Sequence, residues 1–172
     1  GDAKSAIRHF IASMDFSFTR LALLAVSDRT ETICGLSDDE QRCLRAVDAI
    51  TCGSVGYGNA DHPFGVIERM LENEDGRLFA IVLADGVWEH QDRAVSAAKD
   101  CNRAGIETAA IGFGSANQNF LKDISSEDAN ALLVQQSELS SAFGSIAQSI
   151  VGDASGASNY LSPAVEVDTW ES

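Results

Sequence analysis

Two aspartates lie in predicted loops where they could bind a ligand, and the first of them directly follows a buried strand. Asp85 follows an apolar run at residues 78–84 and precedes Gly86, which permits a sharp backbone turn. Asp61 ends a glycine-rich stretch just before a predicted helix with Pro63 in its first turn. Loop carboxylates are the oxygen ligands that hard divalent cations prefer. Either aspartate can instead cap the turn or helix that follows it, so metal binding and capping both stay open.

The sequence lacks the motifs of a recognisable active site. It contains neither the G-x-S-x-G nucleophile turn nor the G-x-x-x-x-G-K-[ST] phosphate loop, and its three histidines are scattered: His9, His62 and His90. Asp85 at a strand end could be a phospho-acceptor of the receiver type or part of a small phosphohydrolase. A receiver also needs a lysine after a later strand, and neither Lys99 nor Lys122 has that position. We therefore predict that the chain is not an enzyme.

Apolar patterning predicts strands that alternate with helices. The expected strands cover residues 19–27, 29–36, 78–84, 106–113 and 131–135. Helices are expected over residues 4–14, 38–50, 63–73, 91–104, 119–124 and 138–151, with Ser37 and Ser137 as caps of the second and the last. Most of the strands are almost wholly apolar, as strands buried on both faces are. The pattern predicts a three-layer, doubly wound α/β fold, with a mostly parallel sheet, helices on both faces and functional loops at the carboxyl ends of the strands.

The charge balance limits the classes of partner. Acidic residues outnumber basic ones by 26 to 12, which gives a formal net charge of −14. Such a surface repels phosphate backbones and anionic lipids, so nucleic acid is not expected as a direct partner. It attracts cations and basic protein surfaces, although the same charge can simply keep the protein soluble. No apolar run reaches the length of a membrane span, so direct membrane insertion is not expected.

The cysteines bear on the compartment. Cys34, Cys43, Cys52 and Cys101 form no C-x-x-C pair and have no histidine at zinc-finger spacing. We expect free, mostly buried thiols in a reducing compartment, and hence a cytoplasmic location. Two disulfides in a secreted domain are the alternative.

The order and spacing of short segments over residues 1–151 resemble those of the von Willebrand factor A-type (VWA, integrin I-like) domain family. The matching segments include KSAIRHF from residue 4, TRLALLAVSD from residue 19, IVLADG from residue 81, AIGFG from residue 110 and FLKDI from residue 120. The resemblance implies the α/β fold predicted above. It also implies that the chain works as a protein–protein interaction module.

The resemblance further implies a metal-ion-dependent adhesion site (MIDAS). In the family, its ligands come from a D-x-S-x-S loop, a threonine before a helix and the aspartate of T-D-G. Asp85 matches the third position, with Ala84 in place of the threonine, and Asp61 falls near the second. The implied cofactor is Mg²⁺, or else Mn²⁺ or Ca²⁺, and a partner protein would bind through a carboxylate ligand or a basic surface. A metal-free scaffold with a degenerate site is the alternative.

By resemblance, the family's first strand and D-x-S-x-S loop would come before residue 1, because the segment that resembles residues 1–10 follows that loop in the family. We divide the chain into a VWA-like domain at residues 1–152 and an acidic Gly/Ser-rich tail at residues 153–172. A parallel sheet without a central strand would leave backbone donors and acceptors unpaired. The tail either supplies that strand, as in a circular permutant, or is an unrelated acidic extension.

The end of the tail resembles the missing segment. Residues 164–169 are expected to form the strand, and Pro163 to precede or start it but not to lie in its middle, because proline cannot donate to a central ladder. Asp168 and Ser172 match the first and last positions of D-x-S-x-S, and Trp170 replaces the middle serine. By resemblance, Asp168 and Ser172 join Asp85 and Asp61 as candidate metal ligands.

Overall fold

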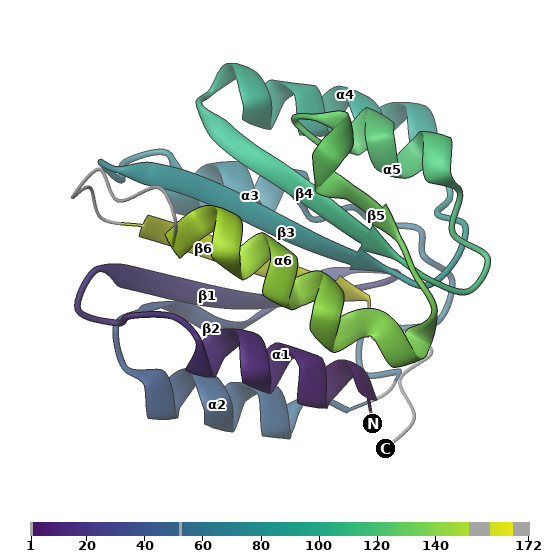
Figure 1. Cartoon of the computed structure of the whole chain (residues 1–172). Helices are drawn as coiled ribbons and strands as arrows, with labels where there is room; N and C mark the ends of the chain where they lie inside the picture. The colour runs from purple at the N-terminus through teal and green to yellow at the C-terminus, as the bar shows by residue number, and fades with distance from the viewer. Residues whose placement is uncertain (1, 52, 152–158, 167–172) are drawn as a thin grey trace.

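The computed structural model describes residues 2–51, 53–151 and 159–166, which build a six-stranded sheet (Figure 1). Its strands are β1 (Thr19–Val26), β2 (Thr30–Ser37), β3 (Arg77–Ala84), β4 (Ile106–Gly112), β5 (Ala131–Leu133) and β6 (Asn159–Glu166). Their order across the sheet is β2-β1-β6-β3-β4-β5. β1 and β2 are antiparallel, and every other neighbouring pair is parallel. The sheet is therefore mostly parallel, with an antiparallel edge strand at β2.

Helices cover both faces of the sheet (Figure 1). One face carries α1 (Asp2–Ala12), α2 (Glu40–Ala49) and α6 (Leu139–Val151), and the other carries α3 (Phe64–Leu71), α4 (Gln91–Arg103) and α5 (Gln118–Ile124). Short 3₁₀ turns at Asp128–Asn130 and Gln136–Glu138 precede β5 and α6. The predicted three-layer, doubly wound α/β fold is confirmed. Among the described residues, no helix combines the length and apolar character that crossing a bilayer requires.

The sheet separates two apolar cores, and β3 shows why its sequence is apolar throughout. Phe79, Ile81 and Leu83 enter the core under α1, α2 and α6, whereas the residues between them enter the core under α3, α4 and α5. Successive side chains of a strand point to opposite faces, so a strand covered on both sides needs apolar residues at every position. Full burial of each large side chain contributes about 1.5–3 kcal/mol.

The last strand of the chain, β6, lies at the centre of the sheet. It pairs in parallel with β1 on one side and with β3 on the other. The strand begins at Asn159, five residues before the 164–169 segment that the sequence predicts, and it ends at Glu166. The predicted start was therefore wrong, and residues 167–169 lie outside the described part of the chain. Asn159 and Ser162 favour turns over strands, so residue propensity does not predict that the strand begins this early.

Pro163 lies inside β6, so the expectation that it precedes or starts the strand and is excluded from its middle was wrong. Pairing with β3 is continuous along the strand, from Asn159 to Val165. Pairing with β1 is interrupted between Leu161 and Ala164, so the N–H that proline lacks falls at a gap in the ladder. β1 is itself irregular at this level, because its register with β2 shifts around Leu23.

The caps of two helices differ from those predicted. α2 is capped by Asp39, whose side chain accepts a hydrogen bond from a first-turn backbone N–H, because Ser37 is still paired with β1 as the last residue of β2. The turn ahead of α6 begins at Gln135, which forms a reciprocal capping box with Glu138. Ser137 is inside that turn and caps nothing.

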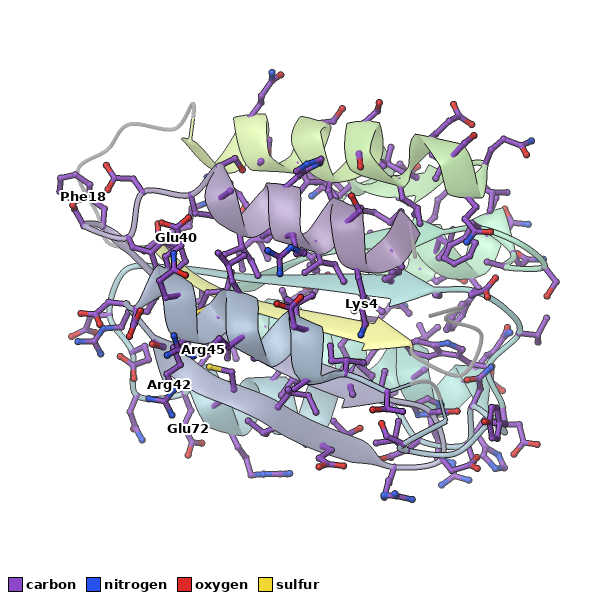
Figure 2. All side chains as sticks on the ribbon, turned by 90° about the horizontal axis from the view of Figure 1, so that it is seen from below. Lys4, Phe18, Glu40, Arg42, Arg45 and Glu72 are labelled. Atoms are coloured by element: carbon purple, nitrogen blue, oxygen red, sulfur yellow. The ribbon has the colours of Figure 1, made fainter. Side chains whose placement is uncertain are left out.

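Basic side chains of α1 hold the end of α2. Lys4 Nζ donates to the Asp48 carbonyl oxygen at 3.3 Å, and Arg8 Nη1 lies 2.5 Å from Asp48 Oδ1. Figure 2 shows Lys4 reaching out from α1 on this side of the molecule. A cation near the carboxyl end of a helix also interacts favourably with its dipole.

Arg77 at the start of β3 joins three elements. Its Nε and Nη2 donate to the Glu107 carboxylate of β4 at 2.7 and 3.2 Å. Its Nη1 donates to the carbonyl oxygens of Ser149 and Ile150, in the last turn of α6, at 3.3 Å each. The guanidinium carbon lies 5.4 Å from the centre of the Phe79 ring. Only 18% of the Arg77 side chain is exposed, so water screens these contacts incompletely.

Arg77→Ala should lower the free energy of unfolding by about 1–3 kcal/mol, because it leaves a half-buried carboxylate and helix-end carbonyls without their donor. The matched control is Arg103→Ala, which removes an exposed pair with Asp100 inside α4 and should cost less than about 0.5 kcal/mol. Urea unfolding followed by circular dichroism measures both values. Equal losses in the two variants would contradict the role given to Arg77.

The structure leaves the described cysteines as free thiols. Cys34, Cys43 and Cys101 are buried and unbridged, and Cys52 lies outside the described residues. Burial, with Cys34 as a neighbour, raises the pKa of the Cys43 thiol to about 12. Burial, with Glu68 and Asp100 nearby, raises the pKa of the Cys101 thiol to about 12. Neither thiol is therefore a nucleophile at neutral pH.

Iodoacetamide at pH 8 should alkylate Cys43 and Cys101 in denaturant but not in the folded protein, as peptide mass spectrometry would show. A raised folded-state pKa also gives a pH dependence. The stability from these protonated thiols is complete below pH 9.0, their ordinary pKa, and is lost as the pH rises toward about 12. The free energy of unfolding should thus fall in that window. Rapid alkylation of either thiol in the native protein would be the contrary result.

Candidate functional site

Loops from several strands meet at one edge of the sheet. β1, β3, β4, β5 and β6 run in the same direction, so their carboxyl ends lie along the same side (Figure 1). The loop that joins α2 to α3 reaches this edge as well, because Asp61 N donates to the Ser27 carbonyl oxygen just after β1, at 2.8 Å. Both aspartates that the sequence singles out, Asp61 and Asp85, are therefore at this edge.

Asp85 stands directly after β3 and is half-buried. Its carboxylate packs over Gly114, which follows β4: a Cβ at Gly114 would overlap Asp85 Oδ1. Gly114 also has a φ of +63°, a region that favours glycine. The Phe113 N–H donates to the Ala84 carbonyl oxygen at 3.0 Å and holds the two strand ends together. Asp85 does not cap the next helix, because α4 has His90 at its N-cap.

Asp61 is held by a side chain of β2. Thr30 Oγ1 donates to Asp61 Oδ2 at 3.0 Å, and the backbone of Asp61 bonds to the loop after β1. The alternative role of helix capping does not apply, because Pro63 is the N-cap of α3 and receives no side-chain cap. One carboxylate oxygen thus accepts a hydrogen bond within the protein, and the other has no hydrogen-bond partner among the described residues.

An aromatic contact joins the two aspartate loops. The His62 ring stacks on Trp88, with ring centres 5.7 Å apart and planes at 17°. His62 Nε2 donates to the Glu89 carbonyl oxygen at 2.7 Å, and the Glu89 N–H donates to the Asn59 carbonyl oxygen at 3.0 Å. The backbone of Asn59 is left-handed, with a φ of +52°. Through these contacts, His62 holds the loop that bears Asp61 against the loop that bears Asp85.

The sequence argument missed Asp28, which organises the glycine-rich loop. Its Oδ2 accepts a hydrogen bond from the Tyr57 N–H at 3.3 Å, and its own N–H donates to the Val55 carbonyl oxygen at 2.9 Å. A Cβ at either Gly56 or Gly58 would overlap the Asp28 carboxylate. The available signal was a carboxylate just after a buried strand, the same signal that identified Asp85, together with alternate glycines in the facing loop.

The donor chemistry suits a hard cation, but the described residues alone do not complete a site. Asp85 and Asp61 supply carboxylate oxygens, the ligands that Mg²⁺ and Ca²⁺ prefer. Within the described part of the chain, no three His, Cys, Asp or Glu side chains come together as metal ligands. The remaining candidates, Asp168 and Ser172, lie outside the described residues. Asp85 and Asp61 are therefore the candidate ligands whose positions the structure describes.

In doubly wound α/β domains, ligands bind at the carboxyl ends of the strands, which is the edge that bears Asp61 and Asp85 here. The family model of the von Willebrand factor type A domain matches residues 2–148. The chain therefore belongs to the VWA family, whose members are generally protein-interaction modules rather than enzymes. No curated protein matches the chain.

Solved structures of other proteins share this fold. BatB of Bacteroides thetaiotaomicron is 17% identical and has a TM-score of 0.70, over 87% of this chain and 85% of that one. The mussel byssus protein PTMP1, solved with a zinc-occupied MIDAS motif, is 19% identical with a TM-score of 0.70, over 86% and 39% of the two chains. Manganese-loaded TRAP of Plasmodium vivax is 18% identical with a TM-score of 0.66, over 81% and 62%. At these identities the likeness supports the fold.

Proposed function

We propose that this VWA domain binds a protein partner through the carboxyl edge of its sheet. Four large apolar side chains are exposed in the described part of the chain: Phe18, Tyr57, Val87 and Leu133. Three of them lie at this edge: Tyr57 and Val87 in loops, with 67% and 59% exposure, and Leu133 at the end of β5, with 44%. Exposed apolar residues that gather on one face favour an interaction surface. Phe18 lies at the opposite edge, just before β1 (Figure 2).

The same edge would hold a divalent metal, Mg²⁺ or else Mn²⁺ or Ca²⁺. Asp85 would be its principal ligand and Asp61 would contribute an oxygen, with Asp168 and Ser172 as further ligands by resemblance to the family's first loop. A metal held by few protein ligands keeps a coordination position open, which a carboxylate of the partner can complete. The zinc in the MIDAS motif of PTMP1 and the manganese in TRAP support this proposal, because both proteins share the fold of this chain.

A metal-free scaffold is the second candidate function. It is favoured by the engagement of Asp61 with Thr30 and by the lack of a three-ligand group among the described residues. In that case the apolar loops would bind the partner by themselves. In either case we propose that the chain has no catalytic activity. The buried free thiols fit a reducing compartment such as the cytoplasm.

We also propose that β6 replaces the family's first strand. That strand comes before the first helix in the family, whereas in this chain the central strand comes after α6. The order would then be a circular permutation, and the carboxyl end of β6 lies at the edge that bears Asp85 because β6 is parallel to β3.

Paramagnetic broadening by Mn²⁺ tests the metal site. In amide NMR spectra of the full chain, a substoichiometric amount of Mn²⁺ should broaden the signals of Asp61, Asp85 and Gly114 first. Asp85→Asn should remove this local effect, whereas Glu72→Gln, a change in an exposed carboxylate at the end of α3, should leave it intact. Broadening spread evenly over the acidic surface would contradict the metal site and leave the metal-free scaffold.

A further inference from the structure

A pocket opens beside Asp85, on the α6 side of the sheet edge. It has a volume of about 580 Å³, within the range of ligand sites. Asp85, Phe113 and Gly114 line it from the ends of β3 and β4, and the segment from Leu133 to Glu138 lines it from β5 and the start of α6. Figure 1 shows these strand ends and the start of α6 at one edge of the molecule. Three separate parts of the chain therefore build this pocket.

The lining combines an apolar wall with two carboxylates. Phe113, Leu133 and Val134 provide the apolar part, and the described residues that line the pocket include no lysine, arginine or histidine. Asp85 packs against Gly114, which has no Cβ to displace it. Glu138 is oriented from the other side, because its Oε1 accepts a hydrogen bond from the Gln135 N–H at 2.9 Å. Both carboxylates are thus positioned by backbone groups of the pocket.

We infer that this pocket binds an arginine side chain of a basic protein partner. Its apolar wall can cover the aliphatic stem of an arginine, and its carboxylates can accept hydrogen bonds from the guanidinium group. A planar guanidinium donates in several directions at once, which suits acceptors on opposite walls better than an ammonium group does. The net charge of −14 attracts such a segment over a distance. This subsite rests on the proposed protein-binding role of the edge.

Asp85 would connect the arginine subsite to the metal site. A divalent cation on Asp85 cancels negative charge at the pocket, so it should weaken binding of a guanidinium group. By thermodynamic linkage, arginine should weaken metal binding by the same factor. With the metal present, the edge would recognise a carboxylate of the partner that binds the metal. Without the metal, it would recognise an arginine of the partner.

Titration with N-acetyl-arginine amide, followed in amide NMR spectra of the full chain in EDTA, tests the subsite. The neutral analogue N-acetyl-citrulline amide has nearly the same shape and is the control ligand. We expect saturable shifts of the amide signals of Gly114, Gln135 and Gln136 with the arginine probe. The dissociation constant should be at least about threefold larger with the citrulline analogue. Equal affinities, or shifts spread over the whole acidic surface, would overturn the arginine subsite.

Substitutions of the lining sharpen the test. Glu138→Gln keeps the capping acceptor and should weaken the arginine probe by about twofold to fivefold, the range of a partly exposed ion pair. Glu127→Gln, a carboxylate outside the lining, should have no effect. Unchanged affinity in Glu138→Gln would count against the subsite. If arginine binds in the pocket with equal affinity in Mg²⁺ and in EDTA, the subsite stands and the proposed metal site fails.

Discussion

A chain that ends at Gly152 should fail to fold. The truncation removes β6, which pairs with β1 on one side and β3 on the other. Both neighbours would lose a hydrogen-bond ladder in the middle of the sheet, and each unpaired buried group costs about 1–3 kcal/mol. Several such groups exceed the total stability of a domain, which is about 5–15 kcal/mol. We expect loss of the cooperative thermal transition in circular dichroism, and aggregation through the exposed strand edges in size-exclusion chromatography.

A chain that ends at Glu166 is the matched control. It retains all of β6 and removes only residues 167–172, so it should melt within a few degrees of the full chain. The same variant lacks Asp168 and Ser172 and therefore also tests their proposed part in metal binding. If the chain that ends at Gly152 stays monomeric and melts at the temperature of the full chain, β6 is not a structural strand and the permuted order is wrong.

Millimolar Mg²⁺ or Mn²⁺ should raise the melting temperature of the full chain. A ligand that binds only the folded state, at a hundred times its dissociation constant, adds about 2.7 kcal/mol to the free energy of unfolding. For a domain of this size each kcal/mol corresponds to about 2–4 °C, so the expected rise is about 5–10 °C. Differential scanning calorimetry in metal and in EDTA measures it.

Asp85→Ala separates metal binding from a general effect of salt. The variant should lose the rise while keeping a cooperative transition in EDTA. Two controls are a NaCl solution of the same ionic strength as the metal solution and the Glu72→Gln variant. They are needed because screening of a net charge of −14 raises stability without a specific site. Identical melting curves of the native chain in EDTA and in metal would eliminate the metal site and favour the scaffold function.

Local sequence patterns predicted most of the elements but missed their boundaries and caps. β3 is apolar at nearly every position, which a strand buried on both faces requires, so its type could be read directly. The cap of α2 could not, because Ser37 and Asp39 are both good capping residues. Pairing of Ser37 with β1 decides between them, and that pairing is a long-range contact.

Pro163 shows the same limit in the sheet. By itself, proline argues against a central strand, because it removes one donor from the ladder. The structure accommodates it because the ladder to β1 is interrupted at that level while the ladder to β3 continues. The irregular pairing of β1, a neighbour of β6 in the sheet but far from it in the sequence, thus decides whether the proline is tolerated.

Hydrophobic periodicity and the ends of apolar strands are local properties, so the fold class and the position of Asp85 at the sheet edge could be predicted from the sequence. Asp61 follows no strand, and a long-range hydrogen bond to Ser27 places it at this edge. The surroundings of both aspartates likewise depend on the tertiary structure. Thr30 donates a hydrogen bond to Asp61, and the Trp88 ring stacks on His62. Gly114 has no Cβ that would collide with Asp85. These partners come from different loops, and their contacts form only when the strands pair and bring the carboxyl ends together. Side-chain environment is set by such long-range packing, so no local pattern encodes it.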